Sequence, residues 1–232
     1  MIALTADELT AIALSLKVAF CSVAVSLPFA LALAYLLARA RFPGKTALDA
    51  IIHLPLVLPP VVIGFALLLL FGRNGSIGAV LERWFGIVVA FRWTGAALAA
   101  AIMGFPLMVR AMRLSIAAID RRLEVAARTL GASRIRIFTT ITLPLILPGV
   151  ITGALLSFAR SLGEFGATIT FVSSIPGETQ TLPLAIYGAT QVPGGDAQAL
   201  RLSLVAVVLS IVALAASEWM TRRARHEPGY WA

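Results

Sequence analysis

The side chains best suited to chemistry form one polar stripe in an otherwise apolar segment. Ser157, Ser161, Glu164 and Thr168 are spaced so that a single α-helix would place them on one face. An isolated charge at the centre of a bilayer costs about 2.5–3.5 kcal/mol. Arg160 lies four residues before Glu164, where it can form a neutralising pair. Two interpretations stay open: the pair is structural, at the outer end of a membrane span, or it belongs to a gate along a solute pathway.

Catalytic chemistry finds little support in the rest of the sequence. There is no His-Glu-x-x-His motif, no nucleophile with an obvious base, and no acidic pair within an apolar stretch. Two histidines and one cysteine make a metal site improbable. Gly44-Lys45-Thr46 looks like the end of a phosphate-binding loop, but Arg39 stands where that loop needs its first glycine. We therefore predict a protein that is not an enzyme and has no cofactor or ATP site of its own.

The composition predicts an all-α, polytopic membrane protein. Hydrophobic residues make up 59% of the 232 residues, charged residues 13%, and the mean hydropathy is +0.94. These values exclude a soluble globule and a disordered chain, and the continuous apolar runs favour helices over a barrel. A sixth span over Phe171–Val192 is less favoured than an outer loop with a short helix, Leu184–Thr190. The five predicted spans are Ile12–Ala38, Ile52–Phe71, Gly95–Val109, Leu145–Leu162 and Leu202–Trp219.

The distribution of basic residues predicts an orientation. The formal net charge is +8, and of the loop cations thirteen fall on one side of the predicted spans and five on the other. Positive charge concentrates in cytoplasmic loops, which explains the net charge without a nucleic acid partner. The amino terminus is then expected outside and the carboxyl terminus in the cytoplasm. The inner set is Arg39, Arg41, Lys45, Arg110, Arg113, Arg121, Arg122, Arg128, Arg134, Arg136, Arg222, Arg223 and Arg225; the outer set is Arg73, Arg83, Arg92, Arg160 and Arg201.

The longest inner segment, Arg110–Leu143, carries seven of these cations and has signals for a short first helix. Asp120 is a suitable N-cap for a helix over residues 121–130. Within it, Glu124 and Arg128 have the spacing of an ion pair. Composition alone would favour a basic loop lying against anionic lipid, whereas these signals indicate an ordered element.

A second helix is expected to follow directly. Gly131 suits the turn between the two helices. Ser133 can cap a helix over residues 134–142, and Pro144 is expected to end it. The inner segment is therefore predicted to form a helix–turn–helix at the cytoplasmic surface.

The spacing within this segment resembles a motif of the permease subunits of binding-protein-dependent ATP-binding-cassette (ABC) importers. The motif is Glu-Ala-Ala, then Gly, then Ile-x-Leu-Pro. In that family this segment is a coupling helix that sits in a groove on a separate ATPase subunit. Small alanines would let the helix seat deeply, and glycine lets the chain turn. The matching residues are Glu124, Ala126, Ala127, Gly131, Ile141, Leu143 and Pro144.

The resemblance implies the rest of the assembly. It predicts the type I importer fold in a single permease domain over residues 1–232, with the coupling segment at about 113–144. The implied partners are a second copy of the permease, two ATPase subunits that bind ATP and Mg, and an external oxyanion-binding protein. The implied location is the bacterial inner membrane. A channel or ion-coupled carrier would leave the coupling motif unexplained.

The solute is suggested by three further stretches. Residues 157–171 resemble the oxyanion branch of these permeases, and residues 53–62 and 175–180 look most like its molybdate members. Molybdate or tungstate is therefore the expected cargo, with sulfate or thiosulfate as the alternative. A tetrahedral dianion would favour hydroxyls and helix N-termini over a carboxylate. The candidate pathway or gate residues are Ser157, Arg160, Ser161, Glu164 and Thr168, with Glu164 a poor ligand.

Overall fold

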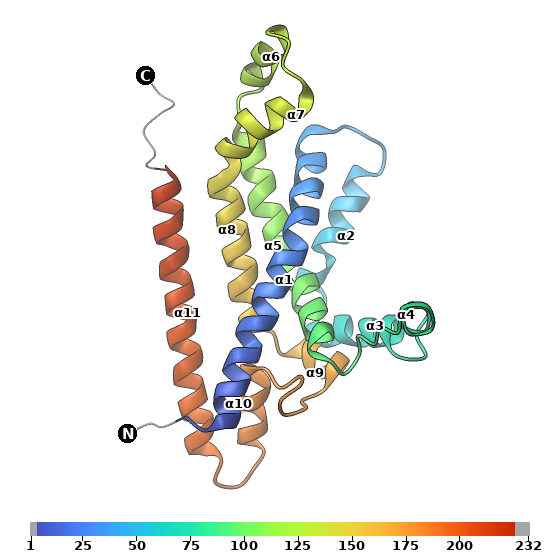
Figure 1. The fold of residues 1–232 in the computed structure, drawn as a ribbon, viewed down its shortest axis with the longest axis vertical. Coiled ribbons are helices and arrows are strands. Elements are labelled where there is room, and N and C mark those ends of the chain that lie inside the picture. The colour runs from blue at the N-terminus through green and yellow to red at the C-terminus, as the bar shows by residue number, and fades with distance from the viewer. Residues whose placement is uncertain (1–3, 226–232) are drawn as a thin grey trace.

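The computed structural model describes residues 4–225, which are mostly helical (Figure 1). The amino-terminal end of α1 and the start of α11 lie at one end of the molecule, and α6 and α7 form the opposite end, called here the tip. The elements are α1 Ala6–Arg39, α2 Lys45–Val57, α3 Pro60–Phe71, α4 Gly78–Phe85, α5 Trp93–Ala118, α6 Arg121–Thr129, α7 Arg134–Ile137, a π-helical segment Phe138–Thr142, α8 Leu143–Leu162, α9 Gly166–Val172, α10 Leu182–Thr190 and α11 Asp196–Arg225.

Four helical segments are long and apolar enough to cross a membrane. They are α1, α5, the continuous helix Arg134–Leu162 and the part of α11 over Asp196–Ala216. They confirm four of the five predicted spans. Within the described residues, Phe171–Val192 holds only the end of α9, a loop and the short helix α10, so the less favoured sixth span does not form there.

The remaining predicted span, Ile52–Phe71, is not one continuous helix. It is divided into α2 and α3, which meet at 113°. The break falls at Leu58, whose backbone is extended (ψ 144°), before Pro59 and Pro60. Proline lacks an amide donor and forces the preceding residue out of the helical region. The bent pair therefore counts as a fifth span only if both arms are taken together.

The core forms where α1, α5 and α8 pack together. Ala96, Ala100 and Gly104 of α5 are buried, and a side chain at Gly104 would overlap Ser157 of α8. Gly149 and Gly153 of α8 also lie against α5, and the closer approach is at Gly149. Small residues let helices approach closely in membranes, so these residues position α8, which carries Ser157 and Ser161 of the polar stripe.

The Gly149 contact makes a testable prediction about stability. Gly149→Ala is expected to lower the free energy of unfolding by about 1–3 kcal/mol, because the added methyl group would overlap the Ser115 side chain. Ser115→Gly in the same chain should restore much of the loss. Tryptophan fluorescence on heating the detergent-solubilised protein would measure both. Gly163→Ala is the matched control, since its methyl group would meet only the Arg160 carbonyl oxygen at 4.0 Å; equal stability of the two single variants would contradict the prediction.

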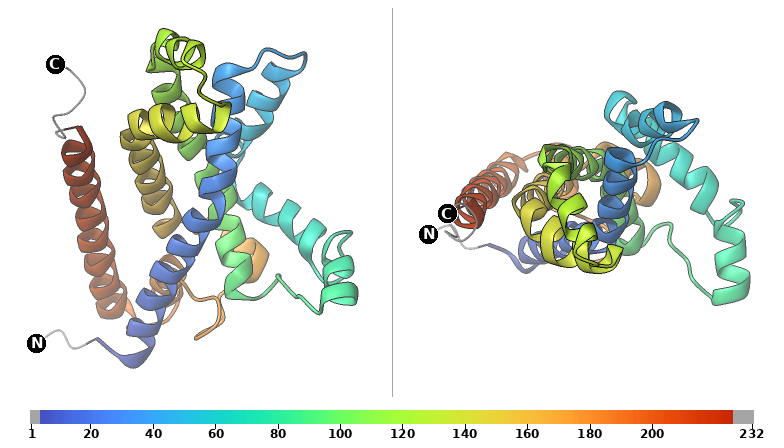
Figure 2. Two further views of the ribbon diagram at one scale, coloured as in Figure 1. Left: turned by 45° about the horizontal axis from the view of Figure 1, so that its top comes forward. Right: turned by 90° about the horizontal axis from the view of Figure 1, so that it is seen from above.

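Helices α3 and α4 form an arm beside the main bundle (Figure 2). Helix α3 packs against α9, and α4 leads away from it. Trp84 and Phe85 at the end of α4 are 77% and 70% exposed, while Arg73 and Glu82 form a loose pair of 3.9 Å. Exposed aromatics beside charged groups are typical of a helix lying at a membrane boundary.

Candidate functional site

The tip is an ordered helix–turn–helix, as predicted. The Arg122 amide donates to Asp120 Oδ1 (2.9 Å), and the Arg136 amide donates to Ser133 Oγ (3.3 Å), so both predicted N-caps are present. Gly131 has a φ of 82°, a left-handed conformation that glycine adopts without a Cβ clash. The local sequence therefore determines where both tip helices begin and how the chain turns between them.

Glu124 connects the tip to the body of the protein. Its Oε1 accepts from Arg39 Nη2 at the end of α1 (2.8 Å) and from Thr142 Oγ1 (3.2 Å). Both side chains of the ion pair are nearly buried, at 12% exposure for Arg39 and 11% for Glu124. The predicted pair between Glu124 and Arg128 is therefore wrong. Glu124 lies on the inward face of α6, where a cation from another helix replaces the local partner.

Two predicted boundaries of the inner segment are also wrong. Helix α5 continues to Ala118, because Met112 and Ile116 extend its buried face beyond Arg110, where the loop was expected to start. At the other end, Pro144 does not end the second helix. The chain passes through the π-helical segment, in which the Leu143 amide donates to the Phe138 carbonyl, and continues as α8. This wider turn brings Pro144 into the first turn of α8, where a missing amide is tolerated.

The seven motif residues surround this connection. Glu124 and Leu143 face the body of the protein, and Leu143 packs against a cluster of buried apolar residues that includes Leu37 and Met112. Ala127 and Ile141 are half-buried. Ala126, Gly131 and Pro144 are exposed. The tip also exposes apolar side chains that the motif does not include: Leu123, Val125, Leu130 and Ile135 at 45%, 57%, 88% and 78%. A signal for them was present in the sequence, as apolar residues among the arginines of a short polar helix.

The polar stripe does not lie on one helix. Helix α8 ends at Leu162 and α9 begins at Gly166, so Glu164 falls in the break and the single helical face predicted for the stripe is wrong. Glu164 Oε2 pairs with Arg160 Nη1 (2.6 Å), which confirms the predicted ion pair. Its Oε1 accepts from the Ala167 amide (2.8 Å). Glu164 thus joins the end of α8 to the first turn of α9, where a carboxylate is favourable.

The stripe is nevertheless brought together inside the chain. Ser157, Ser161, Glu164 and Thr168 are all at most 5% exposed. The Ser161 hydroxyl lies 3.0 Å from that of Ser22 on α1. The Ser157 hydroxyl is buried and has no hydrogen-bond partner among the described residues. The stripe therefore packs against neighbouring helices of the same chain. Arg160, which pairs with Glu164, is half-buried and more accessible than the stripe residues.

Four helical segments long and apolar enough to cross a membrane define the class of the protein as a multi-pass membrane protein. Its fold is similar to a chain of a bacterial alginate ABC transporter crystallised with its periplasmic protein, with a TM-score of 0.75, 18% identity, and coverage of 94% of this chain and 80% of that one.

The family follows from sequence comparison. Residues 26–226 match the family described as "Binding-protein-dependent transport system inner membrane component", and the chain belongs to this family. The chain is 58% identical over 226 residues to the "Molybdenum transport system permease protein ModB" of Escherichia coli (strain K12), covering 97% of this chain and 99% of that protein. It is 58% identical over 222 residues to the protein of the same name from Haemophilus influenzae, covering 96% and 97%.

Family membership settles the general role. The chain is a multi-pass permease of the inner membrane, and it works within an ABC transporter complex that includes a binding protein and ATPase subunits. It is not itself an ATPase, because ATP is bound by the separate subunit.

Proposed function

We propose that this chain is the membrane permease of an importer for molybdate or tungstate. The observation that carries the proposal is its identity of 58%, over nearly the full length of both chains, to a molybdenum transport permease. Residues 1–232 would act as one permease domain that pairs with a second copy and with two ATPase subunits. An external binding protein would deliver the oxyanion.

The coupling segment, at about 113–144, is proposed to contact the ATPase through the tip. Exposed apolar side chains on the basic tip, above all Leu130 and Ile135, are suited to a protein partner. The ion pair of Glu124 with Arg39 would transmit movement of the tip to α1, because separating two mostly buried charges is costly and the two groups therefore move together. The seven motif residues would thus serve coupling, either at the partner surface or just beneath it.

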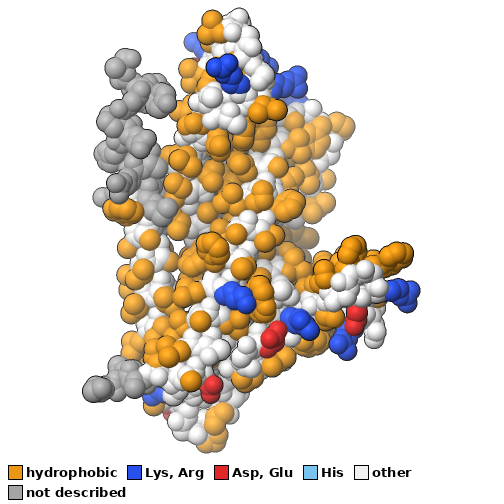
Figure 3. Space-filling model, viewed as in Figure 1, with side chains coloured by type: hydrophobic (Ala, Val, Ile, Leu, Met, Phe, Trp, Pro, Cys, Tyr) orange, Lys and Arg blue, Asp and Glu red, His pale blue; other side chains and the backbone are white. Residues whose placement is uncertain are grey.

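The same proposal orients the chain in the membrane. Figure 3 shows hydrophobic side chains over the middle of one face and Lys and Arg at the tip. The end of α1, the end of α5 and both tip helices carry most of the larger set of cations, which favours a cytoplasmic tip. The amino terminus would be outside and the end of α11 inside. The side chains of Arg222, Arg223 and Arg225 lie outside the described residues.

The polar stripe is proposed to control a gate rather than to bind the cargo. Arg160 and Glu164 bridge the break between α8 and α9, where a change of angle needs no helical hydrogen bond to be broken. Ser157, Ser161 and Thr168 lie buried around this break. A carboxylate would repel a dianion, so Glu164 acts here through Arg160 and the start of α9.

Transport by the reconstituted complex tests this function. The permease is placed in proteoliposomes with its ATPase and binding protein, and ATP-dependent uptake of molybdate, tungstate and sulfate is compared. We expect uptake of molybdate and tungstate to exceed that of sulfate. Preferred uptake of sulfate would assign the chain to the alternative cargo, and uptake by the permease alone would refute an ATP-driven importer.

A variant at the turn of the tip tests coupling. Gly131→Asp is expected to leave membrane insertion intact while lowering molybdate uptake about tenfold relative to ATP hydrolysis. The left-handed φ of Gly131 strains most other residues by about 1–2 kcal/mol, and Asp less than most. The added charge alters the surface offered to the ATPase. Gly86→Asp is the matched control, with a φ of 65° and, like Gly131, open space around the added Cβ, but at the end of α4. Wild-type coupling in Gly131→Asp would refute the assignment.

A further inference from the structure

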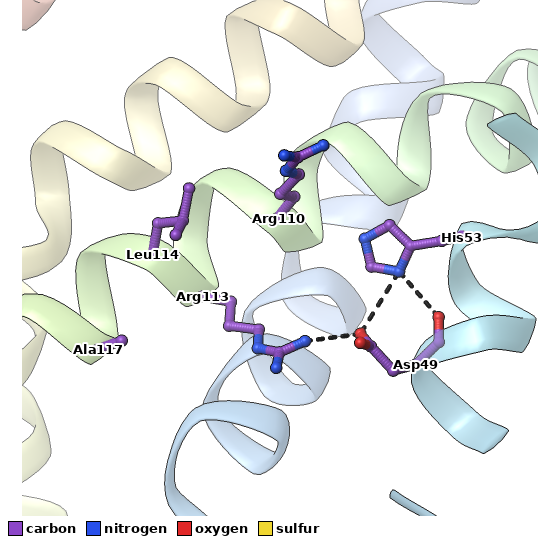
Figure 4. Close-up of a pocket in the computed structure, with 6 residues that line it drawn as sticks. All are labelled: Asp49, His53, Arg110, Arg113, Leu114 and Ala117. Atoms are coloured by element: carbon purple, nitrogen blue, oxygen red, sulfur yellow. Dashed lines mark hydrogen bonds and ion pairs between the residues drawn. The ribbon is translucent and has the colours of Figure 1, made fainter. Parts of the chain in front are cut away.

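A charged cavity lies between α2 and α5, beside neither the polar stripe nor the motif residues of the tip. Its volume is about 470 Å³, and it is open to the surroundings of the protein (Figure 4). Polar and charged side chains form its wall on both helices, and apolar ones complete it on α5. The lining residues are Asp49, His53, Arg110, Arg113, Leu114 and Ala117.

One cation in this cavity has no partner among the residues that the structure describes. Arg113 Nη1 pairs with Asp49 Oδ1 at 2.7 Å, and His53 Nδ1 lies 2.8 Å from the Asp49 carbonyl oxygen and 3.4 Å from Oδ1. Asp49 is therefore neutralised within the cavity. Arg110, one turn before Arg113, makes no hydrogen bond or ion pair with the described residues, and Figure 4 shows it outside the dashed contacts. The cavity consequently has an excess of positive charge.

The arrangement of donors suits a tetrahedral oxyanion. The Asp49 carbonyl oxygen can only accept, so His53 Nδ1 donates to it, and this N–H is not available to an anion. Arg110 offers a planar, permanently charged group that matches two oxygens of a phosphate. Arg113, held by Asp49, offers its remaining N–H groups from one turn further along α5. An anion placed between them would meet two guanidinium groups.

The rim of the cavity indicates what would carry that oxyanion. Leu114 in the cavity is 65% exposed, and Ile51 and Leu54 at neighbouring positions of α2 are 66% and 48% exposed. Exposed aliphatic side chains beside a basic cavity suit a molecule with a charged head and apolar tails. The cavity also lies on the side of the basic tip, where cations meet the membrane boundary, and basic pockets between membrane helices bind anionic headgroups there.

We propose that the cavity between α2 and α5 binds the phosphate of an anionic phospholipid, with Arg110 as its principal ligand. Arg113 completes the site, and Leu114 contacts the acyl chains. The lipid would hold α2 against α5 near the tip. This site is independent of the cargo proposed above, because it requires neither the ATPase nor the binding protein.

Native mass spectrometry of the full-length permease tests the proposal. The protein is purified in mild detergent and titrated with phosphatidylglycerol, and with phosphatidylethanolamine as the zwitterionic comparison. Arg110→Gln is expected to weaken phosphatidylglycerol binding about fivefold, the effect of one basic residue at an anionic surface, without changing phosphatidylethanolamine binding. Ala117→Glu, which places a carboxylate at an exposed position of the cavity, should weaken phosphatidylglycerol binding at least as much. It replaces Arg110→Gln as the test variant if Arg110→Gln is poorly folded.

Arg41→Gln is the matched control, because it removes an exposed cation from the same end without touching the cavity. Equal phosphatidylglycerol binding by wild type, Arg110→Gln and Ala117→Glu would overturn the proposal, as would an equal loss in Arg41→Gln. A separate titration with inorganic phosphate and molybdate distinguishes the source of the oxyanion. Binding of either free ion that depends on Arg110, together with lipid binding that does not, would overturn the phospholipid assignment.

Discussion

Glu124→Ala is expected to lower ATP-dependent molybdate uptake at least tenfold while the protein still inserts into the membrane. Among the described residues, Glu124 is the one partner of the mostly buried Arg39 guanidinium. Arg39 Nε has no hydrogen-bond partner among them. Removing one member of a buried ion pair costs about 3–5 kcal/mol, and ~1.4 kcal/mol already corresponds to a factor of ten. The tip would remain helical, since Asp120 and Ser133 still cap it, but would lose its fixed connection to α1.

Uptake into proteoliposomes and the amount of inserted permease are measured together. Glu82→Ala is the matched control, because the Glu82 pair with Arg73 spans 3.9 Å at the surface and should contribute little. The exchanged pair Arg39→Glu/Glu124→Arg should recover part of the uptake. Normal uptake by Glu124→Ala, or a loss matched by Glu82→Ala, would refute a transmitting role for this connection.

Glu164→Gln is expected to reduce uptake about tenfold with a much smaller effect on folding. Glutamine keeps the shape of the side chain and an oxygen that can accept from the Ala167 amide, so the start of α9 is preserved. The change removes the negative charge that faces Arg160 at 2.6 Å. Arg160 is then free to change its position at the break between α8 and α9.

The double variant Arg160→Gln/Glu164→Gln separates the two interpretations of this pair. Replacing both charges removes the unpaired cation, so thermal stability should return towards the wild-type value. A gate would still be impaired, and uptake should remain low. If Glu164→Gln loses stability and uptake together, and the double variant recovers both, the gate is refuted and the pair has only a structural role.

Features determined by neighbouring residues could be predicted from the sequence. The caps at Asp120 and Ser133, the turn at Gly131 and the ion pair of Arg160 with Glu164 all involve residues within five positions of each other. Four spans followed from apolar length alone. In each case the interaction that decides the structure is contained in a short stretch of chain.

Features decided by distant contacts could not be predicted in the same way. Glu124 had a suitable local partner in Arg128, and only the fold brings Arg39 closer. Helical spacing extended the polar stripe across residues 163–165, yet Glu164 is drawn to the start of α9 and the helix breaks there. Pro144 is a usual stop signal, but the preceding π-helical turn changes the hydrogen-bond register, so the helix continues.

The connection between Arg39 and Glu124 also imposes an order on biosynthesis. Arg39 leaves the ribosome 85 residues before Glu124, so the first helix enters the bilayer with its cationic end still without a counter-ion. That end must wait at the lipid headgroups until four further helices have been made, and Thr142 arrives another 18 residues later. A nascent chain that stalls before position 124 therefore lacks the carboxylate that pairs with the Arg39 guanidinium in the folded protein.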